Sequence, residues 1–287
     1  MKRLLIINPR AGKYKKIRED IEKIFSKTDL TIKETKKKLH ARELAKKAVG
    51  KYDVVIVAGG DGTINEVING IAGTKVKVGI IPNGTENVIA QELGIPKDHK
   101  KAAKVVLKGK TKTYDLGKAN GRYFMMMTGI GLDAKAAKNV DNRPVLKKML
   151  GRGMYHVTAI QTYLTDKPSK LKIWLDDQIL PRWGYYAIVG NIKLYGGNLK
   201  LTPIARPDDG YLDICIFKNK DIFSMMKYFV GATYKNKIIE MPSIEYFRVK
   251  KIKIESEKKV LAHTDAEIIG TTPVEIEAIP KSIKIIS

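Results

Sequence analysis

Residues 58–66 read Ala-Gly-Gly-Asp-Gly-Thr-Ile-Asn-Glu and directly follow an apolar run, Tyr52–Val57. Glycines at the end of a strand let backbone N–H groups face a ligand without a Cβ in the way. We expect Thr63 or Asn65 to begin a helix there, and the N-terminus of a helix attracts anions. The Asp61 carboxylate would be repelled by bound phosphates unless a cation lay between them. The stretch therefore predicts a metal–nucleotide site, with an ordinary strand-to-helix turn as the alternative.

Two commoner phosphate-binding motifs do not fit this sequence. A dinucleotide fingerprint requires a third glycine where Asn65 stands. A P-loop requires serine or threonine after Gly-Lys, whereas Tyr14 follows Gly12-Lys13. Both commoner motifs are therefore rejected. Because we expect the loop to serve ligand and metal binding, we predict that Asp61 contributes little to packing.

Residues 1–112 alternate short apolar runs with segments of helical periodicity. The apolar runs are Leu4–Ile7, Leu30–Thr35, Tyr52–Val57 and Val76–Ile81; the helical faces are Ile17/Ile21/Ile24/Phe25, Leu39/Leu44/Ala48 and Ile64/Val67/Ile68/Ile71. Such alternation predicts an α/β domain whose parallel sheet is covered by helices and binds ligands beyond the carboxyl ends of its strands. The glycine-bearing loops after residues 7, 58 and 81 each follow a strand, so we expect them at the same edge.

Residues 113–287 show apolar runs without regular intervening helices. Strands are expected over Lys112–Lys118, Arg122–Met127, Lys170–Leu175, Trp183–Gly190, Tyr211–Phe217, Ile244–Glu257 and Pro273–Glu277, and helices over Ala134–Val140, Leu146–Leu164 and Ile222–Gly231. This pattern predicts a second, mainly antiparallel β domain. We place the domain boundary between residues 112 and 113, near Lys108-Gly109-Lys110, and leave open that the last residues pack back on the first domain.

The 287-residue chain has a formal net charge of +24 at pH 7. Its lysines form short clusters, such as Lys36–Lys38, Lys100–Lys101 and Lys250–Lys251, without interleaved aromatic residues. Because nucleic-acid binding surfaces need such aromatics for base stacking, we expect no nucleic-acid partner. A solvated basic surface and attraction to an anionic membrane both remain open.

The single cysteine, Cys215, lies in the apolar run Leu212–Phe217 and is interpreted as a core residue, in keeping with a reducing cytosol. The four histidines lack the spacing of a zinc site. No apolar run approaches the roughly 20 residues of a membrane span, and Met1–Ile7 is too short for a signal peptide. We expect a cytoplasmic protein with peripheral membrane contact.

A series of short motifs runs through nearly the whole chain. They are Asn8–Gly12, Thr35, His40-Ala41, Gly59–Thr63 with Asn65-Glu66, Pro82–Asn87, Thr128–Ala134, Gly190-Asn191, Gly196-Gly197, Pro207–Asp213 and Asp265–Glu267. In this order they resemble the diacylglycerol kinase catalytic superfamily, in particular the bacterial lipid kinases that share it with sphingosine and ceramide kinases.

The resemblance implies that ATP lies in a cleft between the two domains, with its phosphates held by the Gly-Gly-Asp-Gly-Thr loop and a second loop containing Thr85. The implied nucleotide contacts are Asn8, Thr35, Gly59, Gly60, Asp61, Gly62, Thr63, Asn65 and Thr85. Residues Gly84–Asn87 also fit an ordinary helix cap, and both interpretations stand.

The resemblance further implies that Glu267 is the general base, with Asp61 as the next candidate for a catalytic role. Ala266 replaces a glycine of the family's Asp-Gly-Glu motif, and a positive φ there would cost stability or turn the loop. Glu86 stands where the family often has a small residue. A surface turn carrying two acids is the alternative for Asp265–Glu267.

Pro207–Gly210 has the composition of a type I turn. The resemblance implies a structural Mg²⁺ at this turn, held by the Asp209 carboxylate and the main-chain carbonyls of Arg206 and Tyr211. Mixed oxygen ligands suit such a hard cation, and a turn is what brings carbonyls around an ion.

The sequence thus predicts an ATP-dependent lipid kinase of phospholipid metabolism that phosphorylates a hydroxyl of a diacylglycerol-like or other lipid. An NAD kinase-like enzyme shares the Gly-Gly-Asp-Gly loop and is the first alternative. A non-catalytic nucleotide-binding membrane adaptor is the second, supported by the departures at Glu86 and Ala266. Homo-oligomer formation is left open.

Overall fold

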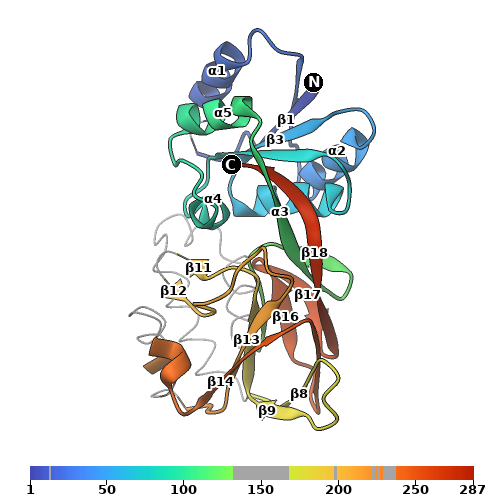
Figure 1. The fold of residues 1–287 in the computed structure, drawn as a ribbon, viewed down its shortest axis with the longest axis vertical. Coiled ribbons are helices and arrows are strands. Elements are labelled where there is room, and N and C mark those ends of the chain that lie inside the picture. The colour runs from blue at the N-terminus through green and yellow to red at the C-terminus, as the bar shows by residue number, and fades with distance from the viewer. Residues whose placement is uncertain (13, 132–167, 197–198, 222–223, 225–226, 229–236) are drawn as a thin grey trace. The chain divides into compact units, whose positions relative to one another are not determined.

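The computed structural model describes residues 1–12, 14–131, 168–196, 199–221, 224, 227–228 and 237–287 (Figure 1). The chain forms two compact units. Unit 1 comprises Met1–Leu116, Pro207–Gly210 and Ile279–Ser287, and unit 2 comprises Gly117–Arg206 and Tyr211–Ala278. The helices expected over Ala134–Val140 and Leu146–Leu164, and most of that over Ile222–Gly231, lie outside the described residues.

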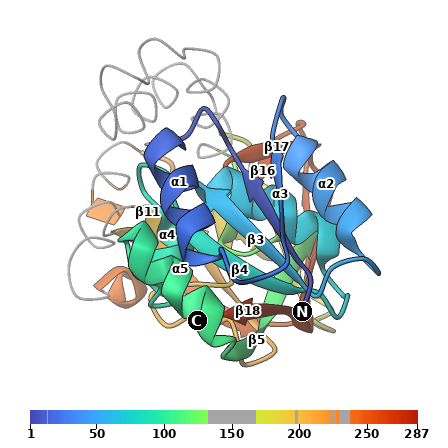
Figure 2. The ribbon, with the colours of Figure 1, turned by 90° about the horizontal axis from the view of Figure 1, so that it is seen from above.

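Unit 1 is an α/β layer structure built on parallel strands. Its strands β1 (Arg3–Ile7), β2 (Leu30–Glu34), β3 (Val54–Gly59) and β4 (Lys77–Pro82) pair in the order β2-β1-β3-β4, and the end of β18 (Val274–Ile286) joins β4 in parallel. The helices are α1 (Tyr14–Ile24), α2 (His40–Ala48), α3 (Asp61–Ile71), α4 (Val88–Glu92) and α5 (His99–Lys108). Figure 2 shows α1 and α5 on one face of these strands and α2 and α3 on the other. The predicted helix-covered parallel sheet is confirmed.

The core of unit 1 comes from strands that are apolar on both faces. All six residues of β3 are buried, as expected for a central parallel strand between two helical layers. Ile17, Ile21 and Phe25 from the α1 segment pack in the same cluster as Leu5 and Ile7 of β1. Burial of aliphatic side chains of this size stabilises the fold by about 1.5–3 kcal/mol each.

Two helix predictions need correction. The buried face of α2 consists of Ala41, Ala45 and Ala48, whereas Leu39 precedes the helix and is 39% exposed. The small alanines fit because α2 packs closely on α3, where a Cβ on Gly70 would lie 2.6 Å from the Ala45 Cβ. Helix α3 begins at Asp61, ahead of the predicted start at Thr63 or Asn65.

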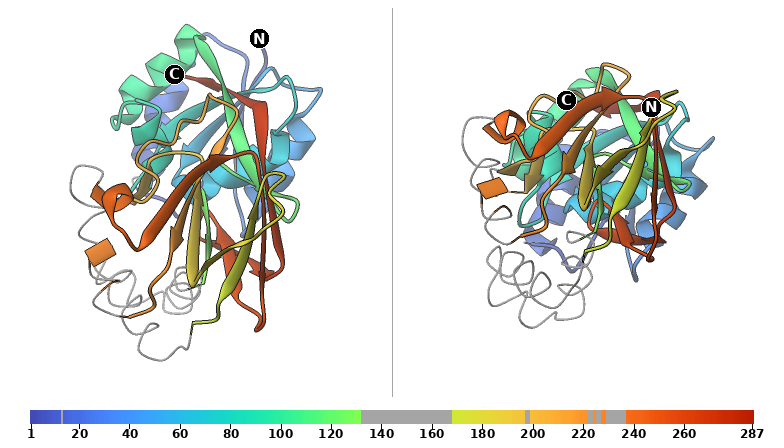
Figure 3. Two further views of the ribbon diagram at one scale, coloured as in Figure 1. Left: turned by 60° about the horizontal axis from the view of Figure 1, so that its bottom comes forward. Right: turned by 90° about the horizontal axis from the view of Figure 1, so that it is seen from below.

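Unit 2 is an antiparallel β sandwich. One sheet has the order β14-β13-β10-β7-β16-β17, and the other contains β15, β8 and β9 beside the first part of β18, with β6 paired to the end of β5. Figure 3 shows the strands of this unit in two further views. The strand β5 (Thr111–Ala119) begins in unit 1 and enters unit 2 at Gly117. The other strands are β6 (Arg122–Phe124), β7 (Met127–Ile130), β8 (Leu171–Leu175), β9 (Arg182–Gly184), β10 (Tyr186–Gly190), β11 (Leu194–Gly196), β12 (Leu199–Lys200), β13 (Leu212–Phe217), β14 (Ile244–Val249), β15 (Lys251–Ser256), β16 (Leu261–Thr264) and β17 (Glu267–Thr271), with a 3₁₀ helix at Lys237–Glu240. The predicted antiparallel second domain is confirmed.

The structure divides three of the expected strands. Arg122–Met127 contributes to β6 and β7, Trp183–Gly190 to β9 and β10, and Ile244–Glu257 to β14 and β15. In all three cases the two strands join different sheets, because the chain passes from one layer of the sandwich to the other; between β14 and β15 it does so at Lys250. Inward-facing residues from both sheets, including Ile214 and Ile254, form one buried cluster. Cys215 is buried, as predicted.

Candidate functional site

Three loops of unit 1 meet where β1, β3 and β4 end. The Asn8 side chain donates to the Thr63 hydroxyl at 3.3 Å, and the Asn83 side chain donates to the Ala11 carbonyl at 2.8 Å. The Asn83 backbone N–H donates to the Gly59 carbonyl at 2.9 Å. The prediction that these loops share one edge is therefore confirmed, because adjacent parallel strands end side by side.

Glycine is required where the loops touch. A Cβ on Gly84 would lie 2.6 Å from the Gly60 Cα, closer than any real side chain allows. Gly12 has a φ of +48°, and a Cβ there would collide with the Asn83 side chain. Larger residues at these positions would push the loops apart, so the sequence fixes a close backbone approach that suits a phosphate-binding site.

A polar pocket of unit 1 opens at this edge. Its lining residues are Asn8, Arg10, Thr35, Lys36, Lys37, Lys38, Thr63 and Glu66. Three predicted nucleotide contacts, Asn8, Thr35 and Thr63, are thus brought together, and the basic side chains add positive charge beside their hydroxyl and amide groups. Sequence reasoning missed Arg10 and counted Lys36–Lys38 as a general basic cluster, although their adjacency to Thr35 was visible.

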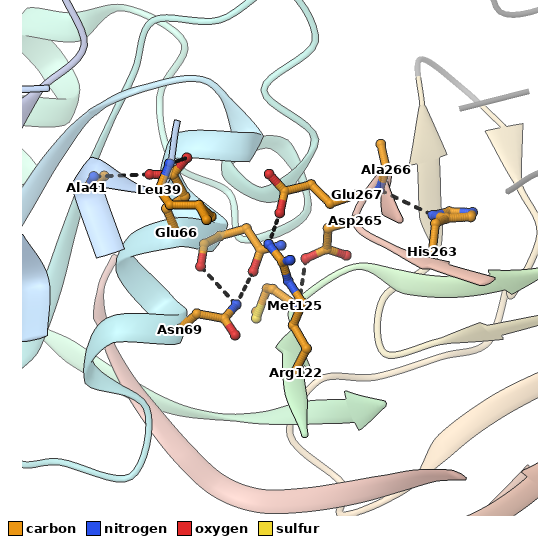
Figure 4. Close-up of polar contacts among 11 residues, drawn as sticks. Leu39, Ala41, Glu66, Asn69, Arg122, Met125, His263, Asp265, Ala266 and Glu267 are labelled. Atoms are coloured by element: carbon orange, nitrogen blue, oxygen red, sulfur yellow. Dashed lines mark hydrogen bonds and ion pairs between the residues drawn. The ribbon is translucent and has the colours of Figure 1, made fainter. Parts of the chain in front are cut away.

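Glu66, which also lines this pocket, has a structural role. Its carboxylate accepts the backbone N–H groups of Leu39 at 2.9 Å and Ala41 at 3.0 Å (Figure 4). These bonds satisfy donors at the start of α2, which the Leu39 N-cap position leaves without a side-chain partner. Glu66 therefore fixes the loop that carries Thr35 and the three lysines.

Asp61 does more than the sequence predicted. Its carboxylate accepts the N–H groups of Val88 and Ile89, each at 3.0 Å, and so caps the first turn of α4. Burial raises the pKa of the Asp61 carboxyl, while the bonds from Ile89 and Val88 oppose this shift. The prediction that Asp61 contributes little to packing is wrong, because this carboxylate links the loop after β3 to the start of α4.

The remaining predicted nucleotide contacts lie in different surroundings. Thr85 is exposed and does not cap α4. The loop before the helix is closed by Asn87, whose side-chain oxygen accepts the Gly84 N–H at 2.8 Å and whose side-chain nitrogen donates to the Gly84 carbonyl at 2.9 Å. Asn65 is buried, and its side-chain oxygen Oδ1 accepts from the side-chain amide of Asn69 at 2.6 Å. The Asn65 amide nitrogen has no hydrogen-bond partner among the described residues, as expected of a donor reserved for a ligand.

The predicted metal turn is held by an aspartate that the sequence reasoning missed. Asp115, buried in unit 1, accepts the N–H groups of Gly210 and Lys281, both at 2.6 Å, and its own N–H donates to the Pro207 carbonyl at 2.7 Å. Gly210 has a φ of +80°. The turn is thus shaped by its neighbours, and Asp209 within it is half-buried. Among the described residues no cluster of three or more His, Cys, Asp or Glu side chains forms a metal site.

In unit 2, Glu267 follows the tight turn between β16 and β17. Asp265 and Ala266 both have positive φ, 46° and 65°, as in the two-residue turns of β-hairpins. Glu267 forms an ion pair with Arg122 of β6 (Figure 4). Arg122 was not predicted; it marks the start of a strand, and nothing in its local sequence points to Glu267.

Asp265 clamps this turn to the β6–β7 connection. Its carboxylate accepts the N–H groups of Met125 and Met126 at 3.0 Å and of Met127 at 2.9 Å. The Asp265 N–H donates to the Met127 carbonyl at 2.9 Å. Burial raises the pKa of Asp265 to about 6, in spite of these bonds. The alternative of a mere surface turn is excluded for Asp265, which is 5% exposed.

The raised pKa of Asp265 predicts a pH-dependent stability. Between the ordinary pKa of 3.8 and the folded value of about 6, the folded protein binds more protons than the unfolded chain. The free energy of unfolding should therefore fall by up to about 3 kcal/mol as pH rises through this window. Asp265→Asn removes this titration, so urea unfolding from pH 4 to 6.5 should give a flatter curve for the variant. Parallel curves for the two proteins would contradict the assignment.

Comparisons with known proteins agree with this architecture. Residues 2–119 match the model of the diacylglycerol kinase catalytic domain, and residues 127–287 match that of the YegS C-terminal NAD kinase beta sandwich-like domain. The chain belongs to the diacylglycerol kinase family. The diacylglycerol kinase of Bacillus subtilis is 31% identical over 83% of this chain and 79% of its own length.

Further relatives align with almost the whole of this chain. The diacylglycerol kinase of Staphylococcus epidermidis is 29% identical over 98% of this chain and 90% of its own length. The crystal structure of a diacylglycerol kinase from Bacillus anthracis superposes with a TM-score of 0.78 at 29% identity, covering 99% of this chain and 96% of that one. The chain is accordingly a lipid kinase. In the described part of the chain no helix has the length and apolar character needed to cross a membrane.

Proposed function

We propose that this lipid kinase transfers the γ-phosphoryl group of ATP to a hydroxyl of a diacylglycerol-like lipid. The observation that carries the proposal is the pocket of unit 1, where Asn8, Thr35 and Thr63 lie beside Arg10 and Lys36–Lys38. Hydroxyl and amide groups can donate to phosphate oxygens, and the cations offset the phosphates' negative charge. Gly59, Gly60 and Gly62 allow the backbone to approach the phosphates closely.

Glu267 is the proposed general base. As the lipid hydroxyl loses its proton to the Glu267 carboxylate, its oxygen bonds to the γ-phosphorus, and the bond from that phosphorus to the bridging oxygen of ADP breaks. Arg122 holds the carboxylate in unit 2, and the Asp265 clamp fixes the turn on which it stands. The base is therefore presented by a rigid hairpin, which favours a fixed direction of proton transfer.

Mg²⁺ is proposed as the metal. At the turn the proposed donors are the Asp209 carboxylate and the carbonyls of Arg206 and Tyr211, an all-oxygen set that suits this cation. Asp115 maintains the turn through its bonds to Gly210 and Lys281. When bound with the nucleotide, Mg²⁺ supplies neutralisation of the phosphate charge.

A lipid substrate requires the enzyme to reach a membrane surface. We propose a cytoplasmic enzyme of phospholipid synthesis in peripheral contact with the bilayer, aided by its net charge of +24. Each basic side chain near an anionic surface contributes about 1 kcal/mol of attraction.

The test is an assay of the purified full chain with labelled ATP and Mg²⁺. Diacylglycerol, other lipid alcohols and NAD are offered separately, the lipids in mixed micelles. We expect label in the lipid phase with diacylglycerol or a related lipid alcohol. NAD is included because the model matched by residues 127–287 describes an NAD kinase-like sandwich.

Each other outcome has a distinct meaning. Label on NAD alone would replace the lipid kinase proposal by an NAD kinase. Nucleotide binding without transfer to any acceptor would favour the non-catalytic adaptor. When unlabelled GTP, CTP or UTP is added in competition, preferential use of one of them over labelled ATP would retain the reaction class and refute ATP as the phosphoryl donor.

A further inference from the structure

The hairpin of β8 and β9 in unit 2 carries two apolar side chains exposed to solvent. Ile179 is 90% exposed and Leu180 is 79% exposed, higher fractions than for any other large apolar side chain described. They are neighbours at the tip of the hairpin, whose strands are drawn in yellow in Figure 1. Isolated exposed apolar residues are common, but an adjacent pair on a projecting tip is typical of an interaction site.

The two tryptophans of the chain, Trp174 and Trp183, lie on the strands of the same hairpin. Trp183 is 37% exposed and pairs across the hairpin with Lys172, so both side chains share one face of the sheet. Trp174 lies opposite Lys253 of β15. Indole rings favour the boundary between water and lipid, where an apolar ring and a polar N–H are both satisfied.

Cations surround these rings. The Nζ atoms of Lys170 and Lys172 lie 4.2 and 5.3 Å from the Trp183 ring centroid, and the Lys253 Nζ lies 5.6 Å from that of Trp174. Arg182 pairs with the buried Ile173 and lies 4.9 Å from the Phe247 ring centroid, on the opposite face of the hairpin from Trp183. Acidic groups are also present: Glu255 pairs with Lys253 at 2.8 Å, Glu275 of β18 lies opposite Lys253, and Asp176 and Asp177 lie in the loop. The cations that lie against Trp183 itself are Lys170 and Lys172.

Hydrogen bonds of Asp176 and Gln178 fix the base of the hairpin tip. Asp176 has a φ of +49°, and its carboxylate accepts the N–H groups of Lys250 and Lys251, both at 2.8 Å. The Gln178 N–H donates to the Leu175 carbonyl at 3.1 Å and closes a turn. This aspartate therefore has a structural function, and the exposed pair stands on an ordered support.

We propose that this surface, formed by Ile179, Leu180, Trp183, Lys170 and Lys172, docks the enzyme on an anionic phospholipid bilayer. Ile179 and Leu180 enter the acyl boundary, the Trp183 ring lies at the headgroup level, and the lysines bind lipid phosphates. A second copy of the chain fits poorly, because self-association would bring these cations against one another. Two aliphatic side chains also supply much less than the roughly 800 Å² per partner that a stable interface buries.

The proposal rests on the proposed function only in that a lipid substrate requires access to a membrane. Docking itself needs neither nucleotide nor catalysis, so it is measured separately from turnover. Anchoring by a few apolar side chains and basic groups gives reversible binding that weakens with salt.

The tryptophans provide the test. Full-length protein is mixed with vesicles of phosphatidylglycerol and brominated phosphatidylcholine, and quenching of tryptophan fluorescence is followed without nucleotide. We expect strong quenching on these vesicles, less on neutral ones, and a loss as salt rises from about 0.1 to about 1 M. Ile179→Ser with Leu180→Ser retains both fluorophores and should weaken vesicle partitioning by about 10- to 100-fold.

Matched variants define the site. Val49→Ser removes an apolar side chain that is 40% exposed elsewhere, and Lys46→Gln with Lys47→Gln removes two exposed charges from α2; both should leave partitioning unchanged. Lys170→Gln with Lys172→Gln should reduce it. In micelles the tip variant should retain the parental turnover.

Unchanged quenching by the tip variant would overturn the proposal, as would a change in its sedimentation mass without an effect on vesicles. Absence of turnover in the parental protein, with quenching intact, would instead refute the proposed function alone.

Discussion

Glu267→Gln is expected to lower the phosphoryl-transfer rate by about 10²- to 10⁴-fold, the usual contribution of a general base. Glutamine retains the shape and hydrogen-bonding reach of the side chain but cannot accept the proton of the lipid hydroxyl. Nucleotide affinity should survive, because the proposed phosphate contacts belong to unit 1, whereas Glu267 belongs to unit 2. Single-turnover transfer from labelled ATP, combined with equilibrium nucleotide binding, measures the two quantities separately.

Ala266→Gly is the matched control for this prediction. Ala266 is exposed and has a φ of +65°, a conformation that costs an L-residue roughly 1 kcal/mol and glycine almost nothing. The variant should raise the thermal midpoint slightly and keep or increase the transfer rate. Parental turnover by Glu267→Gln would show that the base lies elsewhere, and Asp61 would be the next candidate. The lipid kinase class would stand in either case.

The parallel half of the fold was predictable because its signals are local. A central strand such as β3 is apolar throughout, and α3 repeats its apolar residues at the helical period, so short windows of sequence contain the answer. The loops with Asn8, Gly59 and Asn83 followed from that order, since parallel neighbours end at one edge. On α2, the buried Ala48 was predicted, but Ala41 and Ala45 escaped prediction because alanines give a weak apolar signal and the adjacent leucines misled the assignment.

The supporting contacts of the site could not be predicted, because they join residues distant in sequence. Asp115 reaches Gly210 and Lys281, and Arg122 reaches Glu267. No periodicity or motif encodes such pairs; they follow from the tertiary fold alone. The β16–β17 hairpin was missed for a related reason, since its turn residues are Asp265-Ala266, without the glycine that usually marks such a turn.

Asp61→Ala is expected to lower transfer by about 10³-fold or more, because the metal that neutralises the phosphates in the proposed mechanism would lose this carboxylate. The structure adds a second effect, since the substitution leaves the N–H groups of Val88 and Ile89 without their acceptor. Loss of a helix cap typically costs about 1 kcal/mol. The thermal midpoint should therefore fall modestly. Activity per folded molecule, measured well below that midpoint, tests the catalytic part.

Asp98→Ala separates the two effects. Asp98 caps α5 by accepting the Lys101 N–H at 2.9 Å, so its removal deletes a cap of the same kind away from the loops that are proposed to bind phosphate. It should lower the midpoint by a similar amount and leave transfer intact. Asp61→Asn complements it, because asparagine keeps one acceptor oxygen for the start of α4 but removes the negative charge that a metal-bound nucleotide requires. If Asp61→Asn transfers phosphate at the parental rate, the carboxylate acts only as the link between the two loops, and its proposed role with the metal is wrong.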